Sequence, residues 1–234
     1  MKADMKNFLK EAFAAPVPVH KKDFLKNVRQ PGISTFSFIF AQLSYIRKRV
    51  WIMSGFIFIL ALVCAAYFGE DSIWMISAMI PFIALFTITE SVKSTIYNMA
   101  ELEMSSRFSL KSIVLARLSA IGLLHLVILC GLVIFTQENV SFSMIRTGVY
   151  LFVPYLLTSV SGLIAARKVQ SKEVIYICMG ISIMVSFLIF VLKENIPSLY
   201  GEKQFIWWCF FASYLTVKTW SEYKKTIYQT EELV

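Results

Sequence analysis

The chain has 234 residues, of which 57% are hydrophobic and 16% are charged, with 20 phenylalanines and a formal net charge of +8. This balance excludes an ordinary soluble globular domain, and repeated apolar runs of about 20 residues match the thickness of a bilayer core. Because the basic residues gather beside the apolar runs, membrane topology and anionic lipid explain the positive charge better than nucleic-acid binding does.

The N-terminal segment, residues 1–50, is too polar to span a bilayer but contains an apolar stripe. Apolar side chains recur there at helical spacing: Phe36, Ile39, Phe40, Leu43 and Ile46. The basic cluster at 47–49 follows directly. This pattern predicts a cytoplasmic N-terminal segment ending in an interfacial amphipathic helix.

The next part of the chain, residues 51–221, is predicted to be a six-span transmembrane domain. The apolar runs are Trp51–Phe68, Ile73–Thr89, Ile113–Phe135, Thr147–Ala166, Val174–Leu192 and Phe205–Ser221. Each span is expected to be helical, because lipid satisfies no open backbone hydrogen bond. The fold class expected is therefore an all-α polytopic membrane protein with a cytoplasmic tail at 222–234.

Lysine and arginine indicate the orientation of these spans. With the N-terminus inside, 20 of them fall on the cytoplasmic side, against Arg146, Lys193 and Lys203 outside. Basic residues in short loops are retained in the cytoplasm. We expect a multi-pass protein of the cell membrane with both termini cytoplasmic.

Small side chains recur three or four positions apart in the fourth and fifth predicted spans: Ser159, Ser161, Gly162, Ala165, Ala166, Ser182 and Ser186. Rows of this kind let transmembrane helices pack closely. The sequence leaves open whether the close partner is another span of the same chain or a second copy.

Ionisable residues are nearly absent from the interior of the predicted spans. Glu90, Lys93 and Arg117 lie near the inner ends and Arg146 near the outer end, where long side chains reach the interface cheaply. Only His125, in the run GLLHLVIL, lies deep. Two interpretations remain for it, a hydrogen bond between helices and a proton relay.

No catalytic or metal-binding pattern accompanies His125. The sequence has no H-E-x-x-H, G-x-S-x-G or Walker A motif. Cys64, Cys130, Cys178 and Cys209 lie inside predicted spans without a C-x-x-C pair, as small core residues would. We expect no catalytic residue, metal site or cofactor on this chain; an intramembrane enzyme would need a second catalytic group beside His125.

A charged interlude, NMAELEMSSRFSLKSIVLARL at 98–118, separates the second and third spans on the predicted cytoplasmic side. The helical rhythm of the second span continues as far as Glu103, and Ser109 is suited to cap the third span. A helical stub joined to two spans is suited to receive a mechanical push from a soluble subunit. An ordinary solvated loop would carry similar charges.

The interlude resembles the segment between the second and third spans of type-2 ABC transporter permeases. In that family a Glu-Leu pair leads to a Ser and then to an apolar run with one basic residue. Glu101 and Leu102 match the pair, Ser109 matches the Ser, and residues 113–118 match the run. The sequence departs from the family at Asn98 and Arg107, where Gly and Pro are frequent, and Ser94 stands near the place of an upstream acidic residue.

The resemblance implies that residues 97–109 form a coupling helix that docks on an ATP-hydrolysing subunit. The coupling residues would be Glu101, Leu102, Glu103, Met104, Arg107 and Phe108. ATP and Mg²⁺ would then be held by the partner ABC ATPase, and a second permease subunit would complete a homo- or heterodimer. The expected function is export of a lipid, peptide or amphipathic compound by alternating access. The alternative is a non-transport membrane sensor or scaffold that recruits a cytoplasmic regulator.

Overall fold

The computed structural model of the chain describes residues 40, 47–91, 110–137, 143–169, 171 and 173–232. The described helices all belong to one compact unit, Thr35–Val234. The coupling segment 97–109, and the predicted interfacial helix except for Phe40, lie outside the described residues. The same is true of Ser109, Lys93 and the end of the predicted C-terminal tail.

The described part of the chain is entirely helical apart from its short connections. Its long helices are α4 (Lys48–Phe68), α5 (Ser72–Ser91), α8 (Leu110–Thr136), α9 (Met144–Lys168), α10 (Val174–Asn195) and α11 (Phe205–Glu232). Three 3-10 turns, η1 (Gly69–Asp71), η2 (Pro197–Tyr200) and η3 (Glu202–Gln204), join neighbouring helices. The all-α prediction is confirmed, and each predicted span falls inside one helix.

Among the described residues, five helices are long and apolar enough to cross a membrane: α4, α5, α8, α9 and α10. The chain therefore has the character of a multi-pass membrane protein. The sixth predicted span begins, as expected, at Phe205, but α11 continues through the polar stretch to Glu232 and is not among the five. Its lysines and hydroxyl side chains lower its apolar character, so six spans remain a prediction.

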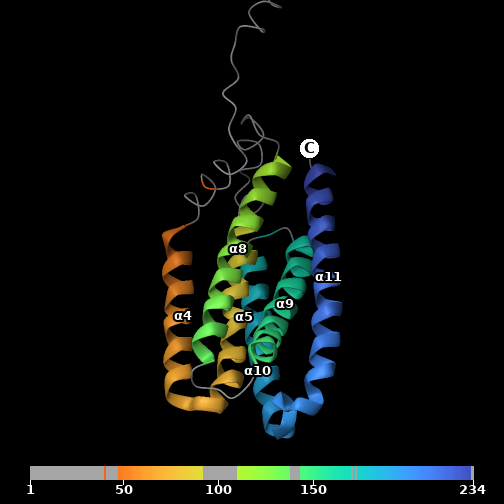
Figure 1. The fold of residues 1–234 in the computed structure, drawn as a ribbon. Helices are drawn as coiled ribbons and strands as arrows, with labels where there is room; N and C mark the ends of the chain where they lie inside the picture. The colour runs from red at the N-terminus through yellow and green to blue at the C-terminus, as the bar shows by residue number, and fades with distance from the viewer. Residues whose placement is uncertain are drawn as a thin grey trace, which may run out of the picture. The chain divides into compact units, whose positions relative to one another are not determined.

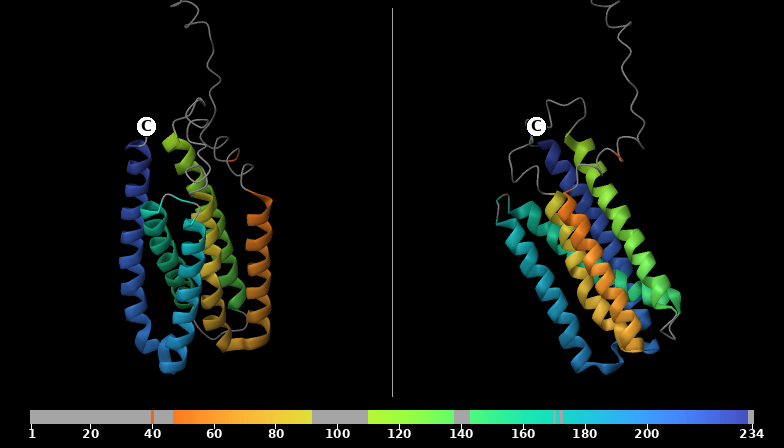
Figure 2. Two further views of the ribbon diagram at one scale, coloured as in Figure 1. Left: turned by 180° about the vertical axis from the view of Figure 1, so that it is seen from behind. Right: turned by 90° about the vertical axis from the view of Figure 1, so that its left-hand side faces the viewer.

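Successive helices alternate in direction (Figures 1 and 2). Helices α4 and α10 begin at one end of the bundle, and α9 ends there in Arg167 and Lys168. We call this end the basic end of the bundle. Helix α5 ends and helix α8 begins at this end as well. Helix α5 is central, because it packs against α4, α8, α9 and α10.

Helices α5 and α9 approach closely at two places. A Cβ atom added to Gly162 would overlap Cδ1 of Ile88 and lie 3.1 Å from its Cγ1, so only glycine leaves room for this contact. Pro154 removes the donor that would bond the carbonyl of Tyr150 one turn earlier. Ser77 of α5 donates its hydroxyl to that carbonyl at 3.1 Å, so the freed acceptor is satisfied by the neighbouring helix.

Helices α5 and α10 are joined in a similar way. Ser186 of α10 donates its hydroxyl to the carbonyl of Ala78 at 2.6 Å, in the turn of α5 that precedes Pro81. Ser182 is fully buried and bonds its own helix at the Cys178 carbonyl. At Gly162 and Ser186, therefore, the small side chains of the predicted rows pack within one chain.

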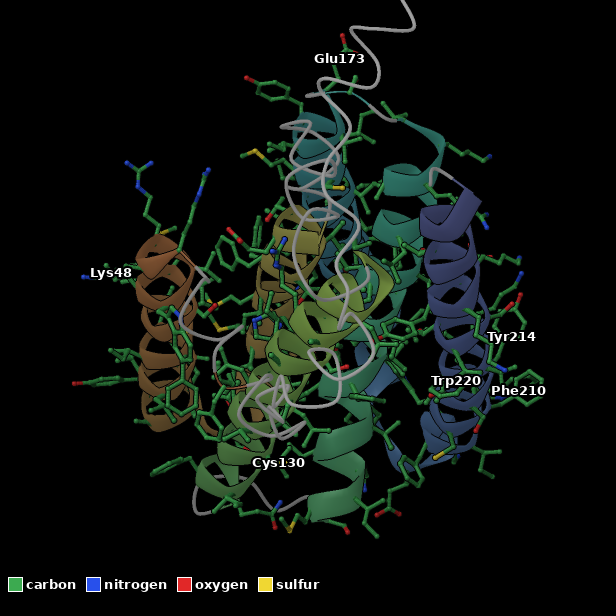
Figure 3. The ribbon with its side chains drawn as sticks, turned by 90° about the horizontal axis from the view of Figure 1, so that it is seen from above. Lys48, Cys130, Glu173, Phe210, Tyr214 and Trp220 are labelled. Carbon is green, nitrogen blue, oxygen red and sulfur yellow. The ribbon has the colours of Figure 1, made fainter. Side chains whose placement is uncertain are left out.

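Large apolar side chains cover the outer faces of α4, α10 and α11, as expected for surfaces in contact with lipid. Figure 3 looks along the bundle and shows Phe210 and Tyr214 projecting outward from α11. Cys130, also labelled there, is exposed on α8. The expectation of four core cysteines is wrong for Cys130 and holds for Cys64 and Cys178, which are buried.

Candidate functional site

Polar side chains from three helices meet around His125 inside the bundle. His125 of α8 has no exposed surface, and its Nδ1 lies 2.7 Å from Oγ1 of Thr87 on α5. The Tyr155 hydroxyl of α9 lies 3.5 Å from the same nitrogen, with the two rings edge to face at 6.0 Å. The deep histidine predicted from the sequence is therefore a bonded junction between α5, α8 and α9.

The imidazole is hydrogen-bonded through one of its two nitrogens. Nδ1 lies within hydrogen-bond distance of the Thr87 and Tyr155 hydroxyls, and whether it donates or accepts depends on the ring tautomer. Nε2 is buried and has no hydrogen-bond partner among the described residues. The structure thus shows the hydrogen bond between helices, and a relay would require a further proton carrier beyond Nε2.

Replacing His125 tests the hydrogen bond between helices. We expect His125→Ala to lower stability by roughly 1 kcal/mol, the scale of a hydrogen bond between membrane helices. Thr87→Val is the matched control, because it removes the same bond from the α5 side with little change in volume. Unfolding in detergent is measured for both. Wild-type stability in both variants would contradict a structural role for this bond.

A buried carboxylate joins α9 and α11 at the basic end. Glu222 is 3% exposed; its Oε1 accepts from Nζ of Lys225 at 2.8 Å and its Oε2 lies 3.0 Å from Nη2 of Arg167. The bond from Lys225, and next the positive charge of Arg167, hold the pKa of Glu222 below its ordinary value. No sequence motif points to Glu222; only its spacing to Lys225 on one helical face indicates a pair.

The opposite end of the bundle is closed by an aromatic cluster and one ion pair. Arg146 donates to Oε1 of Glu202 at 3.1 Å and to the Tyr200 carbonyl at 3.3 Å, with its side chain only 12% exposed. The Tyr150 hydroxyl donates to the same carbonyl at 3.1 Å, and Trp208 packs against both tyrosine rings.

Two predictions about charged residues at the span ends therefore need correction. Arg146 was expected to extend toward the aqueous interface but is held by η2 and η3, because the Tyr200 carbonyl and the Glu202 carboxylate accept hydrogen bonds from its two Nη atoms. Glu90 was expected to reach the interface cheaply, yet it is 6% exposed. Arg146 and Glu90 are therefore more buried than expected for charged side chains at the ends of spans.

The predicted coupling residues lie outside the described residues. Nothing in the described part of the chain brings Glu101, Leu102, Glu103, Met104, Arg107 or Phe108 to a defined place. The described residues contain no group of three His, Cys, Asp or Glu side chains arranged to hold a metal ion. Comparison with protein-family models, curated proteins and solved structures found no match.

Proposed function

We propose that the chain is the membrane subunit of an ATP-driven ABC transporter. Two copies, or one copy and a related permease, would pair in the cell membrane and be served by two ABC ATPase subunits that hold ATP and Mg²⁺. The chain itself binds neither nucleic acid nor nucleotide in this proposal. The cargo class is a lipid, a peptide or an amphipathic compound, moved outward by alternating access across six spans with both termini cytoplasmic.

One structural observation supports this proposal more than any other. The charged interlude connects α5 to α8, and α5 packs against four of the other helices. Its end at Ser91 and the start of α8 at Leu110 both lie at the basic end, which is predicted to be cytoplasmic. A displacement applied there would reach the centre of the bundle, because close packing does not absorb small shifts.

The interlude resembles the corresponding segment of type-2 permeases, so in this proposal the displacement comes from the ATPase subunit docked on it. Leu102, Met104 and Phe108 would supply apolar anchors to the ATPase, and Glu101 and Glu103 would present a negative rim. Apolar contacts at the centre of an interface usually carry its binding energy, whereas rim charges mainly tune encounter rate and salt sensitivity.

Co-purification tests the proposal directly. The chain is isolated from its native membranes in mild detergent, and proteins that remain bound are searched for an ATPase with a Walker A loop. We expect Phe108→Ala or Met104→Ala to weaken that association by about 2 kcal/mol, roughly 30-fold, and to stop transport at matched membrane levels. Glu101→Lys should weaken it in a salt-dependent way.

The control is Lys203→Glu, a charge reversal in η3 at the opposite end of the bundle, which should leave association unchanged. Wild-type association and transport in all three interlude variants would make the interlude an ordinary loop. Recovery of a regulatory protein in place of an ATPase would favour the sensor or scaffold alternative.

A further inference from the structure

A groove runs between α8 and α11 near the basic end, with α9 as its floor. Its volume is about 610 Å³, within the usual range of sites for small organic ligands. Leu118 and Ser119 of α8 form one wall and Leu156 of α9 the floor, while Val217, Trp220 and Tyr223 of α11 form the other wall. Figure 3 labels Trp220 on α11.

The groove combines an apolar body with a polar rim. Leu118, Leu156 and Val217 offer only hydrocarbon, whereas the Ser119 and Tyr223 hydroxyls lie 3.4 Å apart. Helix α8 begins at Leu110 and its predicted apolar run at Ile113, so Leu118 and Ser119 lie in the second turn of that run. That depth corresponds to the boundary between acyl chains and headgroups.

A surplus of positive charge lies beside the groove. Lys224 places its Nζ 5.5 Å from the centroid of the Trp220 ring, which is itself part of the groove wall. Glu222, two residues earlier on α11, is paired with Arg167 and Lys225. The described part of the chain gives Lys224 no salt bridge, so its charge can attract an anion at the rim.

We propose that this groove binds one anionic phospholipid of the cytoplasmic leaflet. An acyl chain lies against the apolar body, and the phosphate lies near Lys224, accepting a hydrogen bond from the Tyr223 hydroxyl, while the Ser119 hydroxyl donates to the Leu115 carbonyl of its own helix. Basic pockets between transmembrane helices on the cytoplasmic side are a recurring form of anionic-lipid site. The site does not depend on the transport proposal.

Lipid binding by the purified full-length protein provides the test. Delipidated protein in detergent is titrated with phosphatidylglycerol or with phosphatidylcholine of the same acyl chains, and bound lipid is counted by native mass spectrometry. We expect phosphatidylglycerol to bind more tightly and its binding to weaken with added salt. Lys224→Gln should lower its affinity about fivefold, the scale of one lysine near an anionic surface.

Two further variants complete the test. Lys203→Gln removes an exposed lysine at the opposite end and should bind phosphatidylglycerol as the wild type does. Val217→Trp fills the groove at a side chain that is 70% exposed, so the fold tolerates it while binding of both lipids falls. The proposal is overturned if wild-type protein binds the two lipids equally, or if either Lys224→Gln or Val217→Trp binds phosphatidylglycerol with wild-type affinity.

Discussion

The double variant Arg167→Met, Lys225→Met should lose about 3–5 kcal/mol of unfolding free energy, measured by denaturant titration in detergent at neutral pH. Glu222 is buried, and these are the two cations within salt-bridge distance of it among the described residues. Removing both leaves a carboxylate that only the more distant charge of Lys218 still stabilises, in a packed junction between α9 and α11. Either single variant should cost less, because the other cation remains in contact.

The pH dependence gives this prediction a second readout. Lys225, and then Arg167, lower the pKa of Glu222 from its ordinary value of 4.5 in the folded protein. A lowered folded pKa contributes stability that is fully present above 4.5 and is lost as the pH falls through the folded value. The double variant lacks both causes, so the difference in stability between wild type and variant should shrink in acid.

Adding Glu222→Gln to the double variant is the matched control, since it removes the buried charge itself. We expect this triple variant to recover most of the lost stability. The prediction is contradicted if the double variant loses less than about 1 kcal/mol of unfolding free energy, or if its loss does not change with pH. Either result would show that Glu222 is well solvated and that its ion pairs contribute little to stability.

Gly162→Leu is expected to destabilise the protein by about 3 kcal/mol, because the new side chain must displace Ile88 at the crossing of α5 and α9. Ile88 is 1% exposed and packs in a cluster with Leu85, Ala166 and Val174, so it has little room to move. Gly162→Ala should destabilise the protein for the same reason, but by a smaller free energy. Thermal unfolding in detergent measures both.

Gly180→Leu is the control for size and for helix propensity. Gly180 lies in α10, and nothing stands within 4 Å of a Cβ atom added there. Its replacement should not destabilise the protein, and the gain in helix propensity should amount to at most about 1 kcal/mol. Ile88→Ala added to Gly162→Leu should restore part of the loss. Equal effects at the two glycines would mean that the close approach of α5 and α9 contributes nothing specific.

The positions of the helices followed from local sequence. Runs such as Val174–Leu192 and Phe205–Ser221 lie inside α10 and α11 because their length and apolar character require a helix whatever surrounds them. The length of α11 was not predictable in this way. Its last residues are polar, and the segment at 222–226 carries Glu222, which packs against α9 through Arg167.

Composition and local pattern were thus sufficient for the all-α class, the approximate positions of the helices and the burial of His125. Which polar side chains bond to one another could be determined only from the folded chain. Thr87 with His125, Ser186 with the Ala78 carbonyl, and Arg167 with Glu222 lie far apart in sequence. A hydrogen bond or ion pair depends on distance and direction between side chains on different helices, which periodicity along one helix does not contain. Packing of the bundle therefore decided which polar groups were satisfied within the chain.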